Sequence, residues 1–461
     1  MKNRTIKSLT IMVSIFTMAA CGSSKQLMSD SSFFDNSKQT SSKLTLNAVK
    51  QLRSPEGLPH SVSYEETTEN GYLAFKDRLT TFSHELSESF VKRYFEDGKN
   101  ITISPLSVEL CLGLSIRCAN GQTRKELLDV LDVDYETFNE YYSRLFNQNN
   151  YVKMTNTGDL MSEMLLTNSI WIDDRITLLD RGLDALRDDY YCYSYEADFA
   201  SKNKETNAAI SNFINDKTRG LIKPDLQLSP DTLFVLMNTL YLKDIWDDCG
   251  SELSYSNNPD YFFTNSNQTK SNKQLLLSPY IEGRAIETED YSSFYTSTIN
   301  GFRIQFIKPN NGKNIRNILT KETMNDVLDP SKYIHQDDTQ LERYYTRCVF
   351  PEYVADGDID LTKIFKEDFN VQSLFNADCD FSNITDKSVF CSDFKQIAKL
   401  EVNKKGIEGA AVTYMAFEAT SVPSEPKHII YEDFLVNKEF GFILTKNDTV
   451  LFSGVVTNID K

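Results

Sequence analysis

Apolar residues recur every three to four positions in the run LAFKDRLTTFSHELSESFVKRYF, residues 73–95. This spacing puts one apolar stripe on an amphipathic helix. A second helix is predicted from SPLSVELCLGLSIRCA, in which Ser104 can cap and Pro105 suits the first turn. TRKELLDVLDV and YETFNEYYSRLF predict two shorter helices, and NAAISNFINDKTRGLI predicts one that stops at Gly220.

Two strand patterns lie among these helices, EMLLTNSIWID and TLFVLMNTLYLKDIW. The first half of the second run is almost continuously apolar, which predicts a strand buried on both faces. From about residue 260 apolar and polar residues alternate, and only NIRNILTKETMNDVL and DLTKIF look helical. Helices first and strands later, without a repeating strand–helix unit, predict an α+β fold with a mainly antiparallel sheet.

The N-terminal region has the features of an export signal followed by a spacer. Lys2, Arg4 and Lys7 precede an apolar run, residues 9–20, which is too short to span a bilayer and is typical of a signal peptide. The run ends in TMAAC, which resembles the bacterial lipobox, so we expect lipidation at Cys21. Ordinary secretory cleavage is the alternative.

These patterns divide the chain into a signal peptide, a tether and one domain. We assign residues 1–20 to the signal peptide, the polar residues 21–69 to a flexible tether, and residues 70–461 to the folded domain. The expected location is the cell envelope, anchored by lipid to the outer membrane on its periplasmic or surface face, or otherwise outside the cell.

Composition excludes several classes of function. A formal net charge of -17 argues against a nucleic-acid partner, which would need clustered Lys and Arg. The seven cysteines beyond Cys21 form no CxxC pair, and the four histidines are scattered, so we expect no metal site and mostly buried, hydrophobe-like thiols. GxGxxG, GxxxxGK[ST], HExxH and GxSxG are all missing from the sequence, and we therefore expect neither a cofactor nor an enzyme.

Five ordered segments between about residue 70 and residue 461 resemble the serpin family. They are listed here in chain order: NITISPLSVELCLGLSIRCANGQTRKELLDVL, ISNFINDKTRGLI, VLMNTLYLKDIW, SDFKQIAKLEVNKKGIEGAAVTY and FLVNKEFGFILTKNDTVLFSGVVTNID. The resemblance implies a helix-rich N-terminal half, three mainly antiparallel β-sheets and an exposed reactive-centre loop over about residues 404–427. It also implies a monomeric inhibitor of serine proteases.

In this family a protease attacks the loop as it would a substrate, and the loop becomes a strand of a sheet after it is cut. By resemblance, the hinge of the loop is Lys404, Gly406, Ile407, Glu408, Gly409, Ala410, Ala411, Val412 and Thr413. In a strand, the side chains of Ile407, Gly409, Ala411, Thr413, Met415 and Phe417 would face the core. The opposite face would carry both acidic residues of the segment, Glu408 and Glu418.

The distance from the hinge glycine in inhibitory relatives places the attacked bond between Thr420 and Ser421. Thr420 after Ala419 suits a small or shallow apolar primary pocket, so the expected targets are elastase-like or subtilisin-like proteases, possibly of a host. Trypsin-like targets are disfavoured because no Arg or Lys lies between residues 406 and 426.

Three departures from the family pattern bear on this interpretation. Lys404 and Glu352 reverse the usual signs together, so we expect their charged groups to contact each other near Trp246. Gln396 replaces the usual histidine of a polar network whose other members, by resemblance, are Ser104, Ser107 and Asn238. Ile407 stands where inhibitory members have Thr or Ser, and its bulk is expected to slow the first step of insertion.

Two other hypotheses remain open. A non-inhibitory serpin that acts as a binding or carrier module is favoured by Ile407 and Gly409. An unrelated, lipid-anchored binding protein would have to treat the five ordered matches as accidental.

Overall fold

The computed structural model describes residues 48–56, 60–154, 160–246, 252–310, 312–333, 342–392, 394–408 and 428–460. These residues belong to one compact unit that spans residues 43–461. The signal peptide, Cys21, residues 22–47 of the tether and residues 409–427 of the loop lie outside the described residues.

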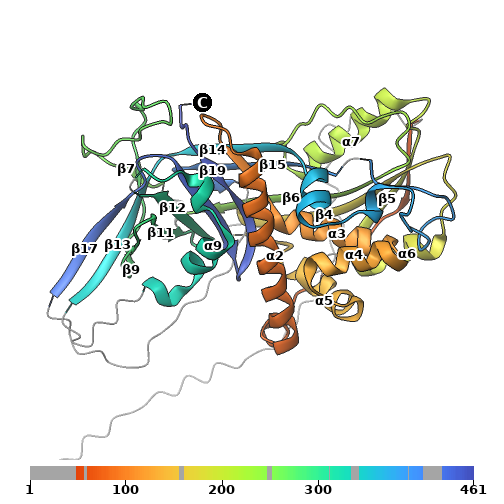
Figure 1. Ribbon diagram of the computed structural model, residues 1–461, viewed down its shortest axis with the longest axis horizontal. Helices are drawn as coiled ribbons and strands as arrows, with labels where there is room; N and C mark the ends of the chain where they lie inside the picture. Colours follow the sequence, from red (N-terminus) through yellow and green to blue (C-terminus); the bar gives the residue numbers. More distant parts are fainter. Residues whose placement is uncertain are drawn as a thin grey trace, which may run out of the picture. The chain divides into compact units, whose positions relative to one another are not determined.

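The helices predicted from periodicity form where expected (Figure 1). In chain order the α-helices of the described residues are α1 Tyr64–Thr67, α2 Asn70–Tyr94, α3 Pro105–Cys118, α4 Gly121–Leu131, α5 Tyr135–Gln148, α6 Asp180–Tyr190, α7 Asn203–Lys217, α8 Ile315–Ile318 and α9 Lys321–Leu328. Ser104 caps α3 by accepting a hydrogen bond from the backbone N–H of Ser107, and Pro105 opens the helix. The run DLTKIF differs, because it leads into a short π-helix at Ile364–Asp368.

The α3–α5 contact depends on one glycine. A Cβ atom on Gly113 would lie 2.2 Å from the ring of Tyr142.

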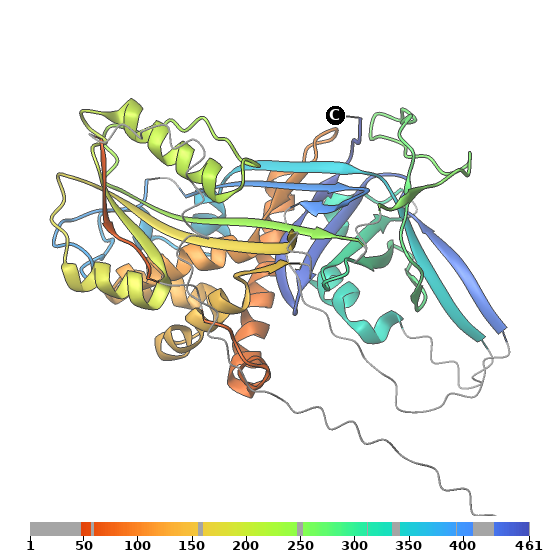
Figure 2. The same cartoon turned by 180° about the vertical axis from the view of Figure 1, so that it is seen from behind.

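The described residues form three sheets, as predicted. The large sheet has the order β1-β5-β4-β6-β16-β15-β14, with β3 paired to β4. Its strands are β1 Val49–Arg53, β3 Tyr151–Met154, β4 Leu160–Asp173, β5 Cys192–Ala197, β6 Phe234–Ile245, β14 Tyr353–Asp360, β15 Lys395–Asn403 and β16 Gly406–Glu408. Figure 2 shows the long strands β4, β6, β15 and β14 running across the molecule, with α7 over one face.

The two smaller sheets contain the C-terminal strands. The six-stranded sheet has the order β10-β11-β12-β18-β19-β2 and the five-stranded sheet has the order β17-β13-β8-β7, with β9 paired to β13. Their strands are β2 Ile101–Ile103, β7 Ser254–Tyr255, β8 Leu276–Leu277, β9 Ile281–Glu282, β10 Ile286–Glu287, β11 Tyr291–Ser297, β12 Arg303–Pro309, β13 Glu342–Phe350, β17 His428–Leu435, β18 Phe440–Lys446 and β19 Thr449–Val456. Most pairs are antiparallel, but β4–β5 and β13–β17 are parallel.

The predicted tether is wrong over its last part. Residues Val49–Arg53 form β1, which pairs with β5 at the edge of the large sheet. Arg53 fixes this strand to α6 through Asp180 at 2.7 Å and Asp184 at 2.8 Å. The segment VKQLR holds only two apolar residues, so its sequence pattern is too weak to predict a strand.

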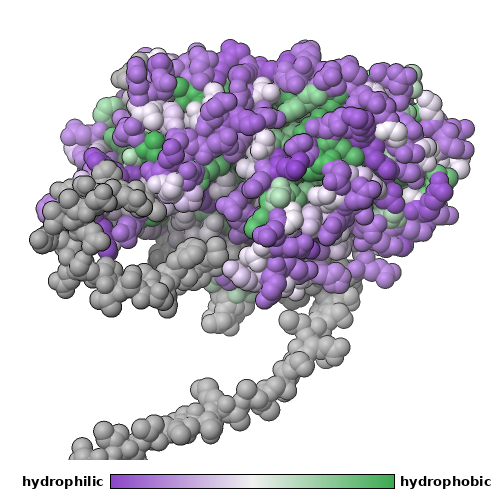
Figure 3. Space-filling model, turned by 60° about the horizontal axis from the view of Figure 1, so that its bottom comes forward, coloured by the Kyte–Doolittle hydropathy of each residue, from purple (hydrophilic) through white to green (hydrophobic). Residues whose placement is uncertain are grey.

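Two apolar layers enclose the large sheet. The main core lies on the side of α3, and a smaller cluster around Trp171, Ile210 and Ile214 lies under α7. Of the predicted hydrophobe-like thiols, Cys118, Cys192, Cys348 and Cys379 are buried. Outside, hydrophilic residues cover most of the face drawn in Figure 3, with hydrophobic residues in smaller areas between them.

The main core also contains a carboxyl group. Glu109 on α3 is 2% exposed and accepts a 2.6 Å hydrogen bond from the Ser83 hydroxyl, while its second oxygen has no hydrogen-bond partner in the described part of the chain. Burial raises the pKa of Glu109 to about 8. The folded protein therefore holds a proton at Glu109 at pH values where the unfolded chain has lost it.

We expect Glu109→Gln to remove part of the loss of stability that occurs as the pH rises from about 4.5 to about 8. Because the folded-state pKa of Glu109 is raised, its contribution is fully present below about pH 4.5 and falls by about 1.4 kcal/mol per pH unit up to about pH 8. The glutamine keeps an acceptor for Ser83 and cannot ionise. Thermal denaturation midpoints measured from pH 5 to pH 8.5 should fall less steeply for the variant than for the wild type.

Glu140→Gln, which changes an exposed glutamate on α5, is the matched control and should follow the wild-type curve. Parallel curves for Glu109→Gln and the wild type would contradict a protonated Glu109.

Candidate functional site

The hinge of the predicted loop begins as a short strand inside the large sheet. β16 (Gly406–Glu408) lies between β6 and β15 and is antiparallel to both. Gly406 is required there because a Cβ atom would lie 1.9 Å from the carbonyl oxygen of Asp244 on β6.

Ile407 and Glu408, the first two residues of the predicted alternating pattern, lie on the predicted faces of the sheet. Ile407 is 1% exposed and belongs to the main core. Glu408 is half-buried on the other face, where the hydroxyl of Tyr241 donates a 2.8 Å hydrogen bond to its carboxylate. Gly409, Ala410, Ala411, Val412 and Thr413 lie outside the described residues, as do Thr420 and Ser421.

Beyond this short strand, the described residues leave one side of β6 without a partner. Residues 234–242 of β6 pair with β4, whereas β16 reaches only residues 243–245. We call the space between residues 234–242 of β6 and residues 395–400 of β15 the open slot. The prediction of full burial is wrong for the start of β6, beside this slot: residues 234–237 contact the apolar layers on both faces but are only half-buried.

The turn that leads from β15 into β16 is held by Glu352 and Trp246. The Glu352 carboxylate accepts hydrogen bonds from the backbone N–H of Lys404 at 2.8 Å and from the Tyr255 hydroxyl at 3.0 Å. The indole N–H of Trp246 donates to the carbonyl oxygen of Asn403 at 2.7 Å. The three residues predicted to meet at this turn therefore do so.

The predicted ion pair between Glu352 and Lys404 needs correction. The Lys404 ammonium group instead binds the Glu252 carboxylate at 2.5 Å. This hydrogen bond raises the pKa of Lys404 and lowers the pKa of Glu252. The Glu352 carboxylate already accepts a hydrogen bond from the backbone N–H of Lys404, and the long Lys404 side chain reaches Glu252 instead. The sequence analysis did not identify Glu252.

The polar network predicted around Gln396 is present in part. Gln396 on β15 forms two 2.8 Å hydrogen bonds with the backbone of Ser104, one to its N–H and one to its carbonyl oxygen. Ser107 donates a 3.5 Å hydrogen bond to the carbonyl oxygen of Asn238 on β6. These contacts join the start of α3 to both walls of the open slot.

The network has a further member that sequence reasoning missed. Asn168 on β4 is fully buried; it accepts a hydrogen bond from the Asn238 amide at 2.9 Å and donates to the Tyr142 hydroxyl at 2.9 Å. The sequence feature that could have identified Asn168 is a single Asn inside the apolar run LLTNSIW. The side-chain oxygen of Asn238 is buried and has no partner among the described residues.

Asp244, opposite Ile407 on β6, was also missed. It is 1% exposed and accepts a 2.7 Å hydrogen bond from the Asn300 amide. Burial raises its pKa to about 6.

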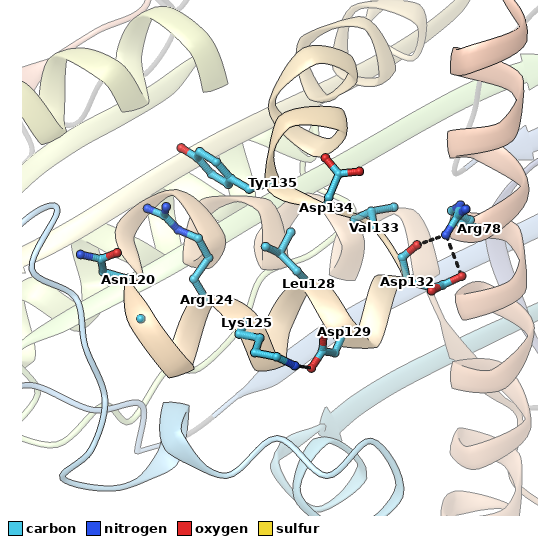
Figure 4. Close-up of a pocket in the computed structure, with 11 residues that line it drawn as sticks. Arg78, Asn120, Arg124, Lys125, Leu128, Asp129, Asp132, Val133, Asp134 and Tyr135 are labelled. Carbon is cyan, nitrogen blue, oxygen red and sulfur yellow. Dashed lines mark hydrogen bonds and ion pairs between the residues drawn. The ribbon is translucent and has the colours of Figure 1, made fainter.

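A shallow hollow of about 660 Å³ lies away from the hinge, between α2, α4 and the start of α5 (Figure 4). Its charges are largely neutralised locally, because Arg78 pairs with Asp132 at 2.8 Å and Lys125 pairs with Asp129. The Arg124 guanidinium stacks over Tyr135 at 4.1 Å. None of the described side chains that line the hollow has a buried polar atom without a hydrogen-bond partner.

Two other features are absent from the described part of the chain. No three His, Cys, Asp or Glu side chains there are grouped so that they could hold a metal ion. No helix among those residues has the length and apolar character needed to cross a membrane.

Known proteins match this chain over most of its length. The family profile described as "Serpin (serine protease inhibitor)" matches residues 77–459. Human Serpin B4 is 24% identical over 81% of this chain and 97% of its own length, and Iripin-8 of Ixodes ricinus is 24% identical over 78% and 88%.

Solved structures agree on the fold. The native state of tengpin, a thermophilic serpin, matches with a TM-score of 0.67 at 19% identity and covers 89% of this chain and all of its own. Arabidopsis AtSerpin1 in its native stressed conformation matches with a TM-score of 0.66 at 18% identity, over 85% of this chain and 99% of its own. With the family profile matched over residues 77–459, the chain belongs to the serpin family of serine protease inhibitors.

Proposed function

We propose that this protein is a suicide substrate that traps serine proteases by inserting its cut loop into the open slot. The observation that carries the proposal is the position of β16, which lies at one end of the slot, while the described residues include no strand that pairs with residues 234–242 of β6 on that side. A strand that continued β16 would lie between the two walls and could form backbone hydrogen bonds with both.

The register of β16 tells which residues would meet. Glu408 pairs with Lys243 on one side and with Glu401 on the other. Continued in the same antiparallel register, Ala411 would come between Leu240 and Ala398, both buried on the α3 side. A small side chain such as that of Ala411 suits this buried position.

The same register brings Thr413 between Asn238 and Gln396. Thr413 is the polar member of the inward-facing set, and the buried oxygen of Asn238 has no partner within the residues that the structure describes. A threonine hydroxyl donated to that oxygen would satisfy it. The loop sequence and the slot therefore fit each other in polarity as well as in size.

Cleavage is proposed between Thr420 and Ser421. The catalytic serine of the protease attacks the carbonyl carbon of Thr420, an ester forms, and the amine of Ser421 leaves as a new N-terminus. Insertion of the freed loop before water hydrolyses the ester would hold the protease covalently. Thr420 favours elastase-like or subtilisin-like enzymes, and the inhibitor is proposed to act as a monomer.

The position of Ile407 in the structure removes the objection to the inhibitory hypothesis that this residue raised in the sequence. Its side chain is already buried in the uncut chain, so its bulk need not enter the sheet during trapping. The non-inhibitory alternative then rests on Gly409 alone.

Export and lipid anchoring are proposed from the N-terminal sequence. Lys2, Arg4 and Lys7 precede the apolar run, and Cys21 follows TMAA. Acylation of Cys21 would fix the domain to the cell envelope through a tether that ends before β1.

The trapping mechanism predicts a covalent complex. After the protein is mixed with pancreatic or neutrophil elastase, a denaturing gel should show a band near the summed mass of both proteins. Mass spectrometry of the released C-terminal peptide should give Ser421 as its first residue. Complete cleavage without a complex, by both elastase-like and subtilisin-like enzymes, would contradict trapping and favour the non-inhibitory alternative.

A charge in the loop should block trapping only when it faces the core. Ala411→Arg would bury an unpaired charge between Leu240 and Ala398, at a cost of several kcal/mol. We expect the amount of inhibitor consumed per trapped protease to rise about tenfold or more. This ratio can be measured by titrating protease activity.

The matched control is Ala410→Arg, one residue earlier, where the side chain would face away from α3. It should trap at close to the wild-type ratio. Equal effects of the two variants would argue against insertion in this register.

Cys21→Ser should release the protein from membranes. A cell that makes the wild type is expected to keep it in the membrane fraction with an acylated N-terminus, whereas the variant should be soluble after lysis. Fractionation with mass spectrometry of the N-terminal peptide checks both points. A soluble, unmodified wild type cleaved near Cys21 would favour ordinary secretion.

A further inference from the structure

An exposed aromatic platform lies on the five-stranded sheet. Tyr431 on β17 is 62% exposed, and Tyr280 and Ile429 are 39% and 45% exposed. The Tyr431 ring makes an edge contact with Tyr280 at 5.0 Å and lies 5.8 Å from Tyr345, its neighbour across the β13–β17 pair. We call Tyr280, Ile429, Tyr431 and Tyr345 the tyrosine platform.

The base of the platform is fixed by a closed hydrogen-bond network. Arg347 holds the Asp433 carboxylate with two hydrogen bonds, of 2.7 and 3.0 Å. Asp433 also accepts hydrogen bonds from Tyr261 at 2.9 Å and from Tyr280 at 3.3 Å. The Arg347 guanidinium lies 4.9 Å from the Tyr280 ring centre.

This arrangement has the properties of a contact surface. The network neutralises the charges beneath the rings and holds Tyr280 in place, so contact with a partner would cost little side-chain entropy. Exposed, rigid tyrosines are the kind of side chain that contributes most at protein interfaces. The fold itself gains little from Tyr431, whose ring is mostly in solvent.

The platform continues directly from the loop that the protease is proposed to cut. Ser421 and Ile429 are eight residues apart in the sequence, so they lie no more than about 29 Å apart even in a fully extended chain. A protease domain of about 230 residues has a radius of gyration of about 17 Å and hence a width of more than 40 Å. A protease bound at Thr420–Ser421 is therefore large enough to reach the start of β17.

We propose that the tyrosine platform binds the body of the target protease in the initial complex and thereby sets which proteases react quickly. This inference rests on the proposed trapping function. Its partner is an apolar or aromatic area of the protease surface beside the active-site cleft, because the charges of the platform are already paired.

The platform acts on one step only. After cleavage, insertion of the loop carries the protease away from the five-stranded sheet, and the contact is lost. Tyr431 should therefore change the rate of association and leave both the stoichiometry of trapping and the lifetime of the covalent complex unchanged. A merely structural role would change the stoichiometry or the stability of the fold instead.

The test compares association rate constants of variants with the elastase-like or subtilisin-like protease that the wild type traps. Tyr431→Ala is expected to lower the second-order rate constant about tenfold, and Tyr431→Phe should react nearly as fast as the wild type. Tyr64→Ala removes an equally exposed tyrosine, 71% exposed on α1, and should have no effect. Ile429→Asp, with a charge in the same area, should also slow association, and it serves as the second variant if Tyr431→Ala folds poorly.

Two results would overturn the inference while the proposed function stands. One is trapping by both Tyr431→Ala and Ile429→Asp at the wild-type rate. The other is a wild-type dimer in solution that Tyr431→Ala dissociates without any change of rate, which would assign the platform to a second copy of the chain. If the wild type forms no covalent complex with any protease, the proposed function itself fails.

Discussion

The rest of the structure depends on a missing strand in the large sheet. Backbone groups along residues 234–242 of β6 have hydrogen-bond partners in β4 but no strand on the other side, among the residues that the structure describes. An unpaired strand edge in the middle of a sheet is costly to keep and ready to pair. β16 fills one end of the open slot and fixes the register in which any further strand must enter. In the proposed mechanism, the hydrogen bonds not yet formed there are the source of the driving force for trapping.

The helix α3 connects this slot to the core of the molecule. Ser104 at its start is clamped by Gln396 on one wall, and Ser107 contacts Asn238 on the other. Moving the walls apart breaks or stretches these bonds, so the slot resists opening until something replaces them. Gln396 forms the clamp without a histidine, and its amide does not titrate near neutral pH.

Sequence periodicity predicted the helices and long strands because each of them buries one regular face. It failed for β1, whose five residues are held by Arg53 and by pairing rather than by an apolar pattern. It also failed for the start of β6, where an apolar sequence is only half-buried because a neighbour is missing. The partner of Lys404 could not be predicted for a third reason. A long cation near two acids takes whichever acid the backbone leaves unoccupied, and that is decided in three dimensions.

The charges around β16 help to explain why the hinge can stay inserted in the large sheet of the uncut chain. Glu408 lies directly opposite Glu401 on β15, an arrangement that would be repulsive by itself. Lys243 lies opposite Glu408 on the other side, and Lys399 pairs with Glu401 at 2.6 Å. The four charges therefore balance, and the Tyr241 hydroxyl adds a hydrogen bond to Glu408. In the proposed mechanism, we expect the barrier to further insertion at the contacts that α3 forms with the two walls of the open slot.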